Sequence, residues 1–168
     1  MGNRRIAELV AEFVPLNRRR VQGNPPLSVL ELERWSELRD LIAYEFGHTP
    51  PIGPARQPRH LRVPTHLKVR YDAEGHQAAS IENLSEGGLF VRCSEPLSPG
   101  TPLHLEIEGG AAGTVTLEAV VVHSRDLENL DGPAGFGVEF QNVEAEEHLR
   151  ILRLIETALA SASDEPSA

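Results

Sequence analysis

The spacing of apolar residues near the start of the chain is that of a helix. From Arg4 to Val14 the apolar residues recur three or four positions apart, which predicts an amphipathic helix. Pro15 is expected to end this helix, because proline inside a helix removes a hydrogen bond and its ring clashes with the preceding turn. The arginines at positions 18–20 then follow it as a solvated segment.

A second amphipathic helix is predicted between Ser28 and Gly47. Ser28 and Glu31 have the spacing of a capping box, and Gly47 is a stop signal. The apolar side of this helix comprises Leu32, Trp35, Leu38, Leu41 or Ile42, and Phe46. Two such helices joined by a short Gly/Pro segment indicate a helical hairpin, whose apolar stripe packs on the next domain or on a second copy of the chain.

Beyond Arg62 the spacing of apolar residues changes to a period of two, which is typical of half-buried strands. The alternation is found in the segments Leu67–Tyr71, Leu103–Ile107, Val115–Val121 and Phe136–Phe140, and Ser80–Arg92 (SIENLSEGGLFVR) adds a polar turn between two strand-like stretches. About six short strands with no helix between them predict an antiparallel β-barrel or sandwich. A helix is then predicted from Glu144 to Ala160.

These patterns divide the chain into four predicted parts. Residues 1–50 form an N-terminal helical hairpin, residues 51–61 a basic linker, residues 62–160 the barrel with its C-terminal helix, and residues 161–168 a disordered polar tail. A chain of 168 residues is long enough to bury a core without covalent cross-links. Its single cysteine, Cys93, excludes an internal disulfide and a cysteine-rich zinc site.

The charge is distributed unevenly along the chain. Residues 1–70 carry 12 Arg or Lys and 7 Asp or Glu, a balance of +5, whereas residues 71–168 carry 4 and 18, a balance of −14. The acidic second part argues against nonspecific binding of nucleic acid over the whole surface. An anionic ligand is therefore expected to approach the arginine-bearing segment near residues 56–70.

The sequence contains no recognisable catalytic motif. It has no P-loop, no GxSxG, no HExxH and no glycine-rich Rossmann turn, and its seven histidines are scattered without metal-ligand spacing. We therefore expect a protein that is not an enzyme and needs no cofactor or metal. No apolar run approaches the length of a membrane span, and the N-terminus lacks the features of a signal peptide, so a cytoplasmic location is expected.

The polar turn Asn83-Leu84-Ser85-Glu86-Gly87-Gly88 fits the pattern (D/N)-x-S-x-x-G. With the basic lead-in that ends at Arg62-Val63-Pro64, and with the late strand GFGVEF before a terminal helix, it resembles the PilZ domain, a bacterial receptor module for cyclic di-GMP. The resemblance extends over about Arg56 to Ala160. It implies a mainly β fold, a six-stranded antiparallel PilZ-type barrel with a C-terminal helix.

The resemblance also implies a ligand site. Asn83 and Ser85, two positions apart in a strand, would point to the same face and address one guanine edge, while Gly88 would allow close approach and a positive φ. Arginine suits the guanine edge and the phosphates of cyclic di-GMP. The family's R-x-x-x-R motif places its second arginine at Arg62 but its first at Pro58, so that Arg59 is a displaced candidate for the clamp.

Because Pro58 stands in place of the first arginine of the motif, two hypotheses of function are open. One is a cyclic di-GMP receptor that uses Arg59, Arg62, Asn83, Ser85 and Gly88 and transmits the second-messenger level through a protein–protein interaction. The other is a PilZ-like scaffold that has lost the ligand and acts through protein contacts alone. The N-terminal helices are the expected surface for a protein partner or for self-association. Binding of nucleic acid through the arginines at 18–20 is a less favoured hypothesis. An ordinary polar hairpin, in which Asn83 and Ser85 satisfy turn amides, would explain the same turn without a ligand.

Overall fold

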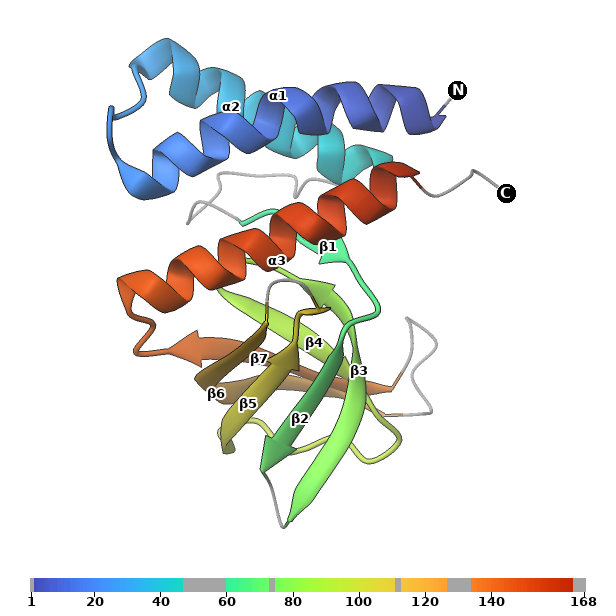
Figure 1. The fold of residues 1–168 in the computed structure, drawn as a ribbon. Coiled ribbons are helices and arrows are strands. Elements are labelled where there is room, and N and C mark those ends of the chain that lie inside the picture. The colour runs from blue at the N-terminus through green and yellow to red at the C-terminus, as the bar shows by residue number, and fades with distance from the viewer. Residues whose placement is uncertain (1, 47–59, 73–74, 111–112, 127–133, 165–168) are drawn as a thin grey trace. The chain divides into compact units, whose positions relative to one another are not determined.

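The computed structural model describes residues 2–46, 60–72, 75–110, 113–126 and 134–164 (Figure 1). The chain forms two compact units. The first comprises Met1–Val63 and Glu156–Ala168, and the second comprises Pro64–Ile155. Most of the predicted basic linker, residues 51–61, lies outside the described residues, as do Gly47 and the last four residues of the predicted tail.

The N-terminal helix is longer than predicted. Helix α1 extends from Gly2 to Gln22 and includes Pro15, so the prediction that this proline ends the helix is wrong. The arginines at 18–20 consequently belong to the end of α1. Phe13 and Asn17, on either side of the proline, are 2% and 3% exposed, whereas Pro15 itself is exposed. Packing of the flanking turns therefore offsets the lost hydrogen bond.

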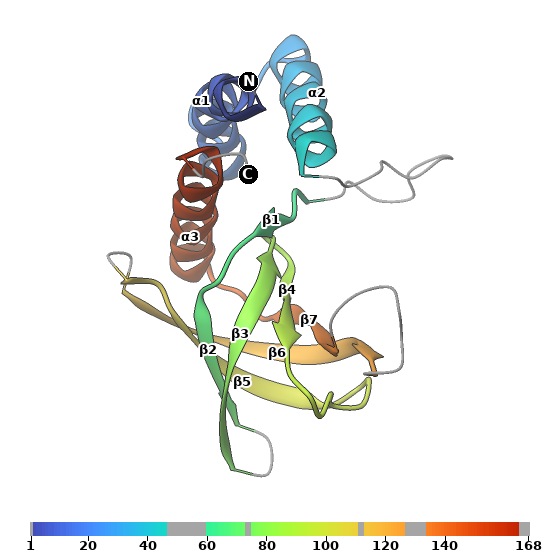
Figure 2. The ribbon, with the colours of Figure 1, turned by 90° about the vertical axis from the view of Figure 1, so that its right-hand side faces the viewer.

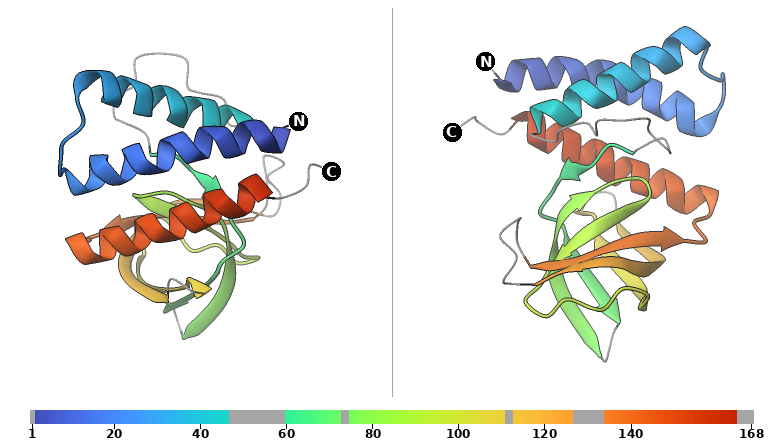
Figure 3. Two further views of the ribbon diagram at one scale, coloured as in Figure 1. Left: turned by 45° about the horizontal axis from the view of Figure 1, so that its top comes forward. Right: turned by 180° about the vertical axis from the view of Figure 1, so that it is seen from behind.

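Helix α2 extends from Val29 to Glu45 and pairs with α1 as the predicted hairpin (Figures 2 and 3). The ring centroids of Phe13 and Trp35 are 6.2 Å apart, and the Trp35 indole N–H donates to Oδ1 of Asn17 at 2.9 Å. On the predicted apolar side of α2, Trp35, Leu38 and Ile42 are buried, but Leu32 is 44% exposed. The seam of the hairpin is thus an aromatic contact with one buried amide.

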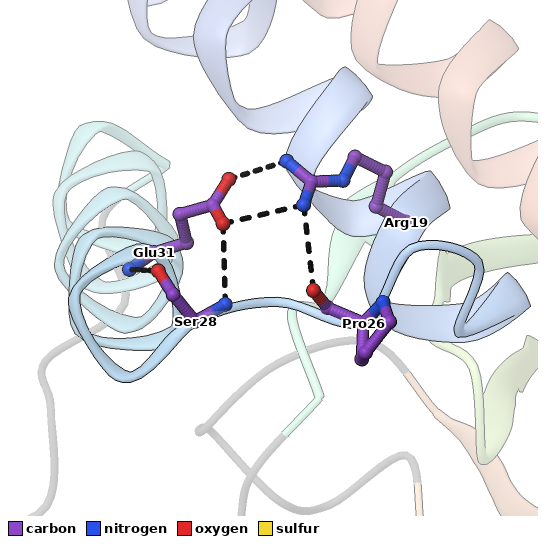
Figure 4. A network of polar contacts seen from close by, with 4 residues as sticks. All are labelled: Arg19, Pro26, Ser28 and Glu31. Carbon is purple, nitrogen blue, oxygen red and sulfur yellow. Dashed lines mark hydrogen bonds and ion pairs between the residues drawn. The ribbon is translucent and has the colours of Figure 1, made fainter.

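The capping box at the start of α2 is confirmed. The Ser28 hydroxyl accepts from the Glu31 amide at 3.2 Å, and the Glu31 carboxylate accepts from the Ser28 amide at 3.1 Å. Arg19 at the end of α1 pairs with the same carboxylate, and Figure 4 shows its guanidinium also reaching the Pro26 carbonyl. The pKa of Glu31 is lowered, first by its hydrogen bond with Arg19. The Glu31 carboxylate therefore connects α1, the start of α2 and the segment between them.

The second unit contains a closed six-stranded antiparallel β-barrel, as the resemblance implies (Figures 1 and 3). Its strands are β2 (Lys68–Asp72), β3 (His76–Leu84), β4 (Gly88–Arg92), β5 (Pro102–Glu108), β6 (Thr114–Arg125) and β7 (Gly135–Gln141). They follow the order β3-β2-β5-β6-β7-β4, and a pairing of β3 with β4 closes the barrel. A short extra strand, β1 (Val63–Pro64), which the periodicity did not predict, adds to β3.

Apolar side chains at alternate positions of the strands fill the interior of the barrel. In β5 and β6 every second residue from Leu103 to Val121 within the strands is buried, and the intervening residues mostly face solvent. Such a pattern buries one face of each strand, because successive side chains point to opposite sides of a sheet. The period-two segments of the sequence are thereby confirmed as strands.

The C-terminal helix α3 extends from Ala145 to Asp164, four residues further than predicted. Residues 161–164 are therefore helical, and the prediction of a disordered tail is wrong for them. Among its apolar residues at helical spacing, Leu152, Ile155 and Leu159 are buried and Leu149 is half-buried. The part of α3 up to Ile155 belongs to the barrel unit, and the part from Glu156 to the helical unit. Within the latter, Arg18 of α1 pairs with Glu156 at 2.7 Å.

Candidate functional site

The polar motif forms the tight turn between β3 and β4. β3 ends at Leu84 and β4 begins at Gly88. The Ser85 amide donates to the Gly88 carbonyl at 2.8 Å, and the Ser85 hydroxyl accepts from the Gly88 amide at 3.2 Å. Ser85 is only 4% exposed. Its hydroxyl therefore closes the turn, as in the reading of this segment as an ordinary polar hairpin.

The predicted alternation of Asn83 and Ser85 in one strand is not found. The strand ends between them at Leu84, and Asn83 is half-buried while Ser85 is buried. Asn83 instead follows a bulge in β3, since Ile81 pairs with Val91 but Asn83 pairs with Phe90. A bulge re-aims the following side chain. The carbonyl of the bulged residue Glu82 accepts from the Thr65 amide at 3.1 Å.

Two reasons were predicted for Gly88, and the structure shows a close approach there, of another strand, but no positive φ. It is absent from the described glycines with positive φ, so its role is not the left-handed backbone that was expected. A Cβ atom at Gly88 would lie 2.1 Å from the Val138 carbonyl oxygen of β7. Because that atom belongs to the backbone of a paired strand, it cannot move aside. Gly88 therefore permits the close approach of β4 to β7 behind the motif turn.

The arginines of the lead-in are only partly described. Arg59 and Pro58 lie outside the described residues. Arg62 is described and exposed, and partial loss of hydration around its guanidinium lowers its pKa. The side chain stays charged, because an arginine pKa remains far above neutral pH. The structure thus places Asn83, Ser85 and Gly88 together on the barrel. Arg62 belongs to the other compact unit, which contains the N-terminal helices.

Four further side chains lie on the same side of the barrel as Asn83, and the sequence patterns did not predict them as part of a site. Phe90 lies opposite both Asn83 of β3 and Gly137 of β7, and His123 of β6 lies opposite Gly137. In the neighbouring row, Arg92 and Arg125 lie on either side of Gly135. The glycine alternation in GFGVEF is the sequence signal for this surface, because glycine within a strand often marks a close approach of other groups.

The motif turn also contacts α3. Nε2 of His148 lies 3.1 Å from Oε1 of Glu86, the residue after Ser85. The Glu86 side chain is 6% exposed and that of His148 38%. A nearly buried carboxylate needs such a partner. This contact connects the turn to the first turns of α3.

Within the residues that the structure describes, no group of three His, Cys, Asp or Glu side chains is placed to hold a metal ion. Cys93 is half-buried, and burial raises its pKa, which leaves the thiol a poor nucleophile. No helix of the described part is long and apolar enough to cross a membrane.

Comparison with known proteins places this architecture in a family. The PilZ domain family model matches residues 55–157. Among curated proteins, none matches the chain by sequence.

Solved structures share the fold at low sequence identity. The PilZ domain of YcgR from Escherichia coli, solved with cyclic di-GMP, is 17% identical, with a TM-score of 0.55 over 64% of this chain and 95% of that chain. The complex of MrkH from K. pneumonia with cyclic di-GMP is 17% identical, with a TM-score of 0.54 over 64% of this chain and 55% of that chain. MotI/DgrA, the inhibitor of motility of Bacillus subtilis, is 19% identical, with a TM-score of 0.53 over 71% and 58%. By its sequence match and by its barrel, the chain belongs to the PilZ domain family.

Proposed function

We propose that this chain is a non-enzymatic, cytoplasmic effector that binds cyclic di-GMP and transmits the level of this second messenger through a protein–protein interaction. The observation that carries the proposal is the (D/N)-x-S-x-x-G segment, Asn83–Gly88, at the β3–β4 turn of a PilZ barrel. The YcgR domain and MrkH, which share the fold, are solved with cyclic di-GMP, and this supports the same class of ligand here.

In this proposal the two sides of the site have different tasks. Asn83, re-aimed by the bulge, addresses a guanine edge, while Ser85 and Gly88 hold the turn that positions it. Arg62, with Arg59 beside it in sequence, supplies charge for a phosphate or for the O6 and N7 atoms of guanine.

Calorimetry of the purified chain with cyclic di-GMP tests the proposal. We expect binding at micromolar ligand, and we expect Arg62→Ala and Asn83→Ala each to lower the affinity. Truncating one partner of a charged, buried contact costs about 2–5 kcal/mol, so Arg62→Ala should weaken binding at least about thirtyfold. Arg70→Ala is the matched control, because Arg70 on β2 is occupied by an ion pair with Glu108 at 2.7 Å. No heat with tens of micromolar wild-type protein contradicts the receptor proposal.

A second candidate function is a PilZ scaffold without ligand. The observation in its favour is Pro58, which stands where the R-x-x-x-R motif has its first arginine and has neither charge nor N–H donor. If wild type does not bind, the variant Pro58→Arg should restore binding provided that the clamp alone is missing. Failure of Pro58→Arg to bind would favour a scaffold that works through protein contacts.

A further inference from the structure

Helix α2 carries most of the large apolar side chains that are exposed in the described part of the chain. Four of the five belong to it, and they are Val29, Leu30, Leu32 and Tyr44. Val29 is 74% exposed and Tyr44 68%. Scattered apolar residues are normal on a protein surface, whereas several on one element mark a contact surface. The side of α2 that faces solvent is therefore a candidate interaction surface.

Helical spacing brings two of these residues onto one face with three carboxylates. We name this face the α2 outer face, and it consists of Val29, Glu33, Glu37, Asp40 and Tyr44. These residues are three or four positions apart and all are exposed, so they lie one above another along the helix. From Val29 to Tyr44 the face extends over about 22 Å, at about 1.5 Å per residue. It is apolar at both ends and acidic between them.

The ion pairs of α2 leave the middle of this face negative. Glu37 pairs with Arg34, and Asp40 pairs with Arg39. In both pairs the carboxylate is the more exposed member, since the side chains of Glu37 and Arg34 are 60% and 41% exposed, and those of Asp40 and Arg39 56% and 18%. Arg34 also donates to both carboxylate oxygens of Glu12 in α1, at 2.6 and 2.7 Å, so two carboxylates share its charge. A molecule that approaches the α2 outer face therefore meets mainly carboxylates.

This charge distribution favours another protein over a second copy of the chain. A twofold contact uses the same surface on both copies. An antiparallel contact that packs Val29 on Tyr44 also brings Glu33 against Asp40, and a parallel contact places each carboxylate against its own equivalent. Like charges that face each other across an interface oppose binding. The complementary occupant is basic where α2 is acidic.

We infer that the α2 outer face is the docking surface for a basic amphipathic helix of another protein, with apolar side chains at its ends and lysine or arginine between them. Apolar side chains at helical spacing are the usual anchors of helix recognition, and tyrosine is enriched among the residues that dominate binding energy. Opposite charges fix the register and speed association. The inference rests on the proposed function for its role in signalling, because it names the partner of that protein–protein interaction.

Two synthetic peptides serve as probes of the full chain. The lysine peptide has about 18 residues, enough to span the face as a helix, with leucines at its ends, lysines at helical spacing between them and alanine elsewhere. The glutamate peptide has glutamate in place of each lysine. Fluorescence anisotropy without nucleotide measures the binding of each labelled peptide. We expect the lysine peptide to bind with a Kd below about 100 μM and the glutamate peptide at least about tenfold more weakly.

Variants of the face test each part of the inference. Tyr44→Ala should weaken binding of the lysine peptide at least about tenfold. The double variant Glu33→Lys, Glu37→Lys should reverse the preference and select the glutamate peptide. Raising the salt concentration from about 0.05 to 0.5 M should weaken binding of the lysine peptide to wild type, because salt screens exposed charges.

Matched controls lie outside α2. Val122→Ala removes the fifth exposed large apolar side chain, and Glu106→Lys with Glu146→Lys reverses two exposed carboxylates of the barrel unit. Both controls should bind the lysine peptide within about threefold of wild type. All variants change exposed residues, and their melting temperatures verify that they are folded.

The outcomes separate this inference from the proposed function. A preference of wild type for the lysine peptide, reversed by the double variant, supports the inference. Absence of that preference overturns it, as does a dimer in light scattering that Tyr44→Ala converts to a monomer, because the face then binds a second copy. Calorimetry of wild type with cyclic di-GMP is the separate test of the receptor: nucleotide binding without peptide preference overturns only the inference, and peptide preference without nucleotide binding overturns only the receptor function.

Discussion

At the scale of single residues, the motif turn owes its shape to Ser85 and Gly88 before any ligand is present. Ser85 bonds to both backbone groups of Gly88, and Gly88 lies against the Val138 carbonyl. Both residues are buried, and the turn that they form determines where Asn83 is held. Direct contact of Ser85 or Gly88 with a ligand stays a prediction.

The first residue-scale prediction concerns Gly88. In Gly88→Ala the new Cβ would lie 2.1 Å from the Val138 oxygen, so β4 and β7 must separate. We expect the free energy of unfolding to fall by at least about 2 kcal/mol. Urea denaturation measures this, with Thr116→Ala at an exposed position of β6 as the control, which should change stability by less than about 1 kcal/mol. Equal stability of Gly88→Ala and wild type would contradict the close approach.

A second residue-scale prediction concerns alkaline pH. Burial, and next the neighbouring Cys93, raises the pKa of Tyr71 from 10.0 to about 12. A raised pKa means that the folded state holds this proton more tightly, so its contribution to stability is complete below pH 10 and is lost as the pH rises toward 12. We expect Tyr71→Phe to remove about 2 kcal/mol of this alkaline loss between pH 9 and pH 11.5. Denaturation of both proteins at pH 9 and at pH 11.5 measures the difference, and parallel pH profiles would contradict it.

At the scale of elements, α1 shows how packing overrides a local stop signal. Pro15 lies inside the helix on an exposed face, while Phe13 and Asn17 anchor the turns beside it. The cost of the proline is offset and not removed. The local sequence alone contains no sign of the partners that supply this compensation.

Replacement of the helix proline is therefore predicted to stabilise the protein. Pro15→Ala restores a backbone donor within α1 and removes the ring clash, and we expect the free energy of unfolding to rise by about 1–3 kcal/mol. Thermal melting measures the gain, and Pro15→Gly should recover less of it because glycine is a weaker helix former. A lower melting temperature of Pro15→Ala would mean that the helix needs its proline geometry for packing.

The contact between the motif turn and α3 gives another element-scale prediction. His148→Ala leaves the Glu86 carboxylate, 6% exposed, without its imidazole partner. We expect a loss of about 0.5–1.5 kcal/mol, the usual net contribution of one hydrogen bond to stability. Arg150→Ala is the control on the same helix, because its pair with Glu146 is largely exposed and contributes little. Equal melting temperatures for the two variants would contradict a structural role of the contact.

At the scale of the whole molecule, the boundaries of the compact units differ from the simple division into hairpin and barrel. The helical unit includes the end of α3 from Glu156 as well as the N-terminal residues. Arg18 pairs with Glu156, and Ala158 and Leu159 are buried. The N-terminal helices thus have a partner within the chain, in addition to any partner protein or second copy.

Deletion of residues 1–50 tests this organisation. Without α1 and α2, the last turns of α3 lose the elements of their unit, and we expect faster amide exchange in residues 156–164 with the barrel strands unaffected. Hydrogen-exchange mass spectrometry measures the protection, and light scattering of the same samples reports the mass. Unchanged protection of residues 156–164 would contradict the composition of the unit, and an unchanged oligomeric state would argue against self-association through the helices.

The sequence by itself determined most of the elements and the family. Period-two alternation predicted the strands because one face of each is buried in the barrel, and the Ser28–Glu31 spacing predicted the start of α2 because a capping box is local. The sequence also contained the motif Asn83–Gly88 and the departure at Pro58. All of these depend on residues close together in the chain.

Only the tertiary structure decided which distant residues meet. The pairing of β4, β7 and β6 brings Phe90, His123 and Arg125 together, although 35 positions separate Phe90 from Arg125 in the sequence. The reason that Gly88 must be glycine lies in Val138 of another strand. Local periodicity contains no information on strand order or on bulges that shift register, so the surface beside Asn83 becomes visible only when the barrel is closed.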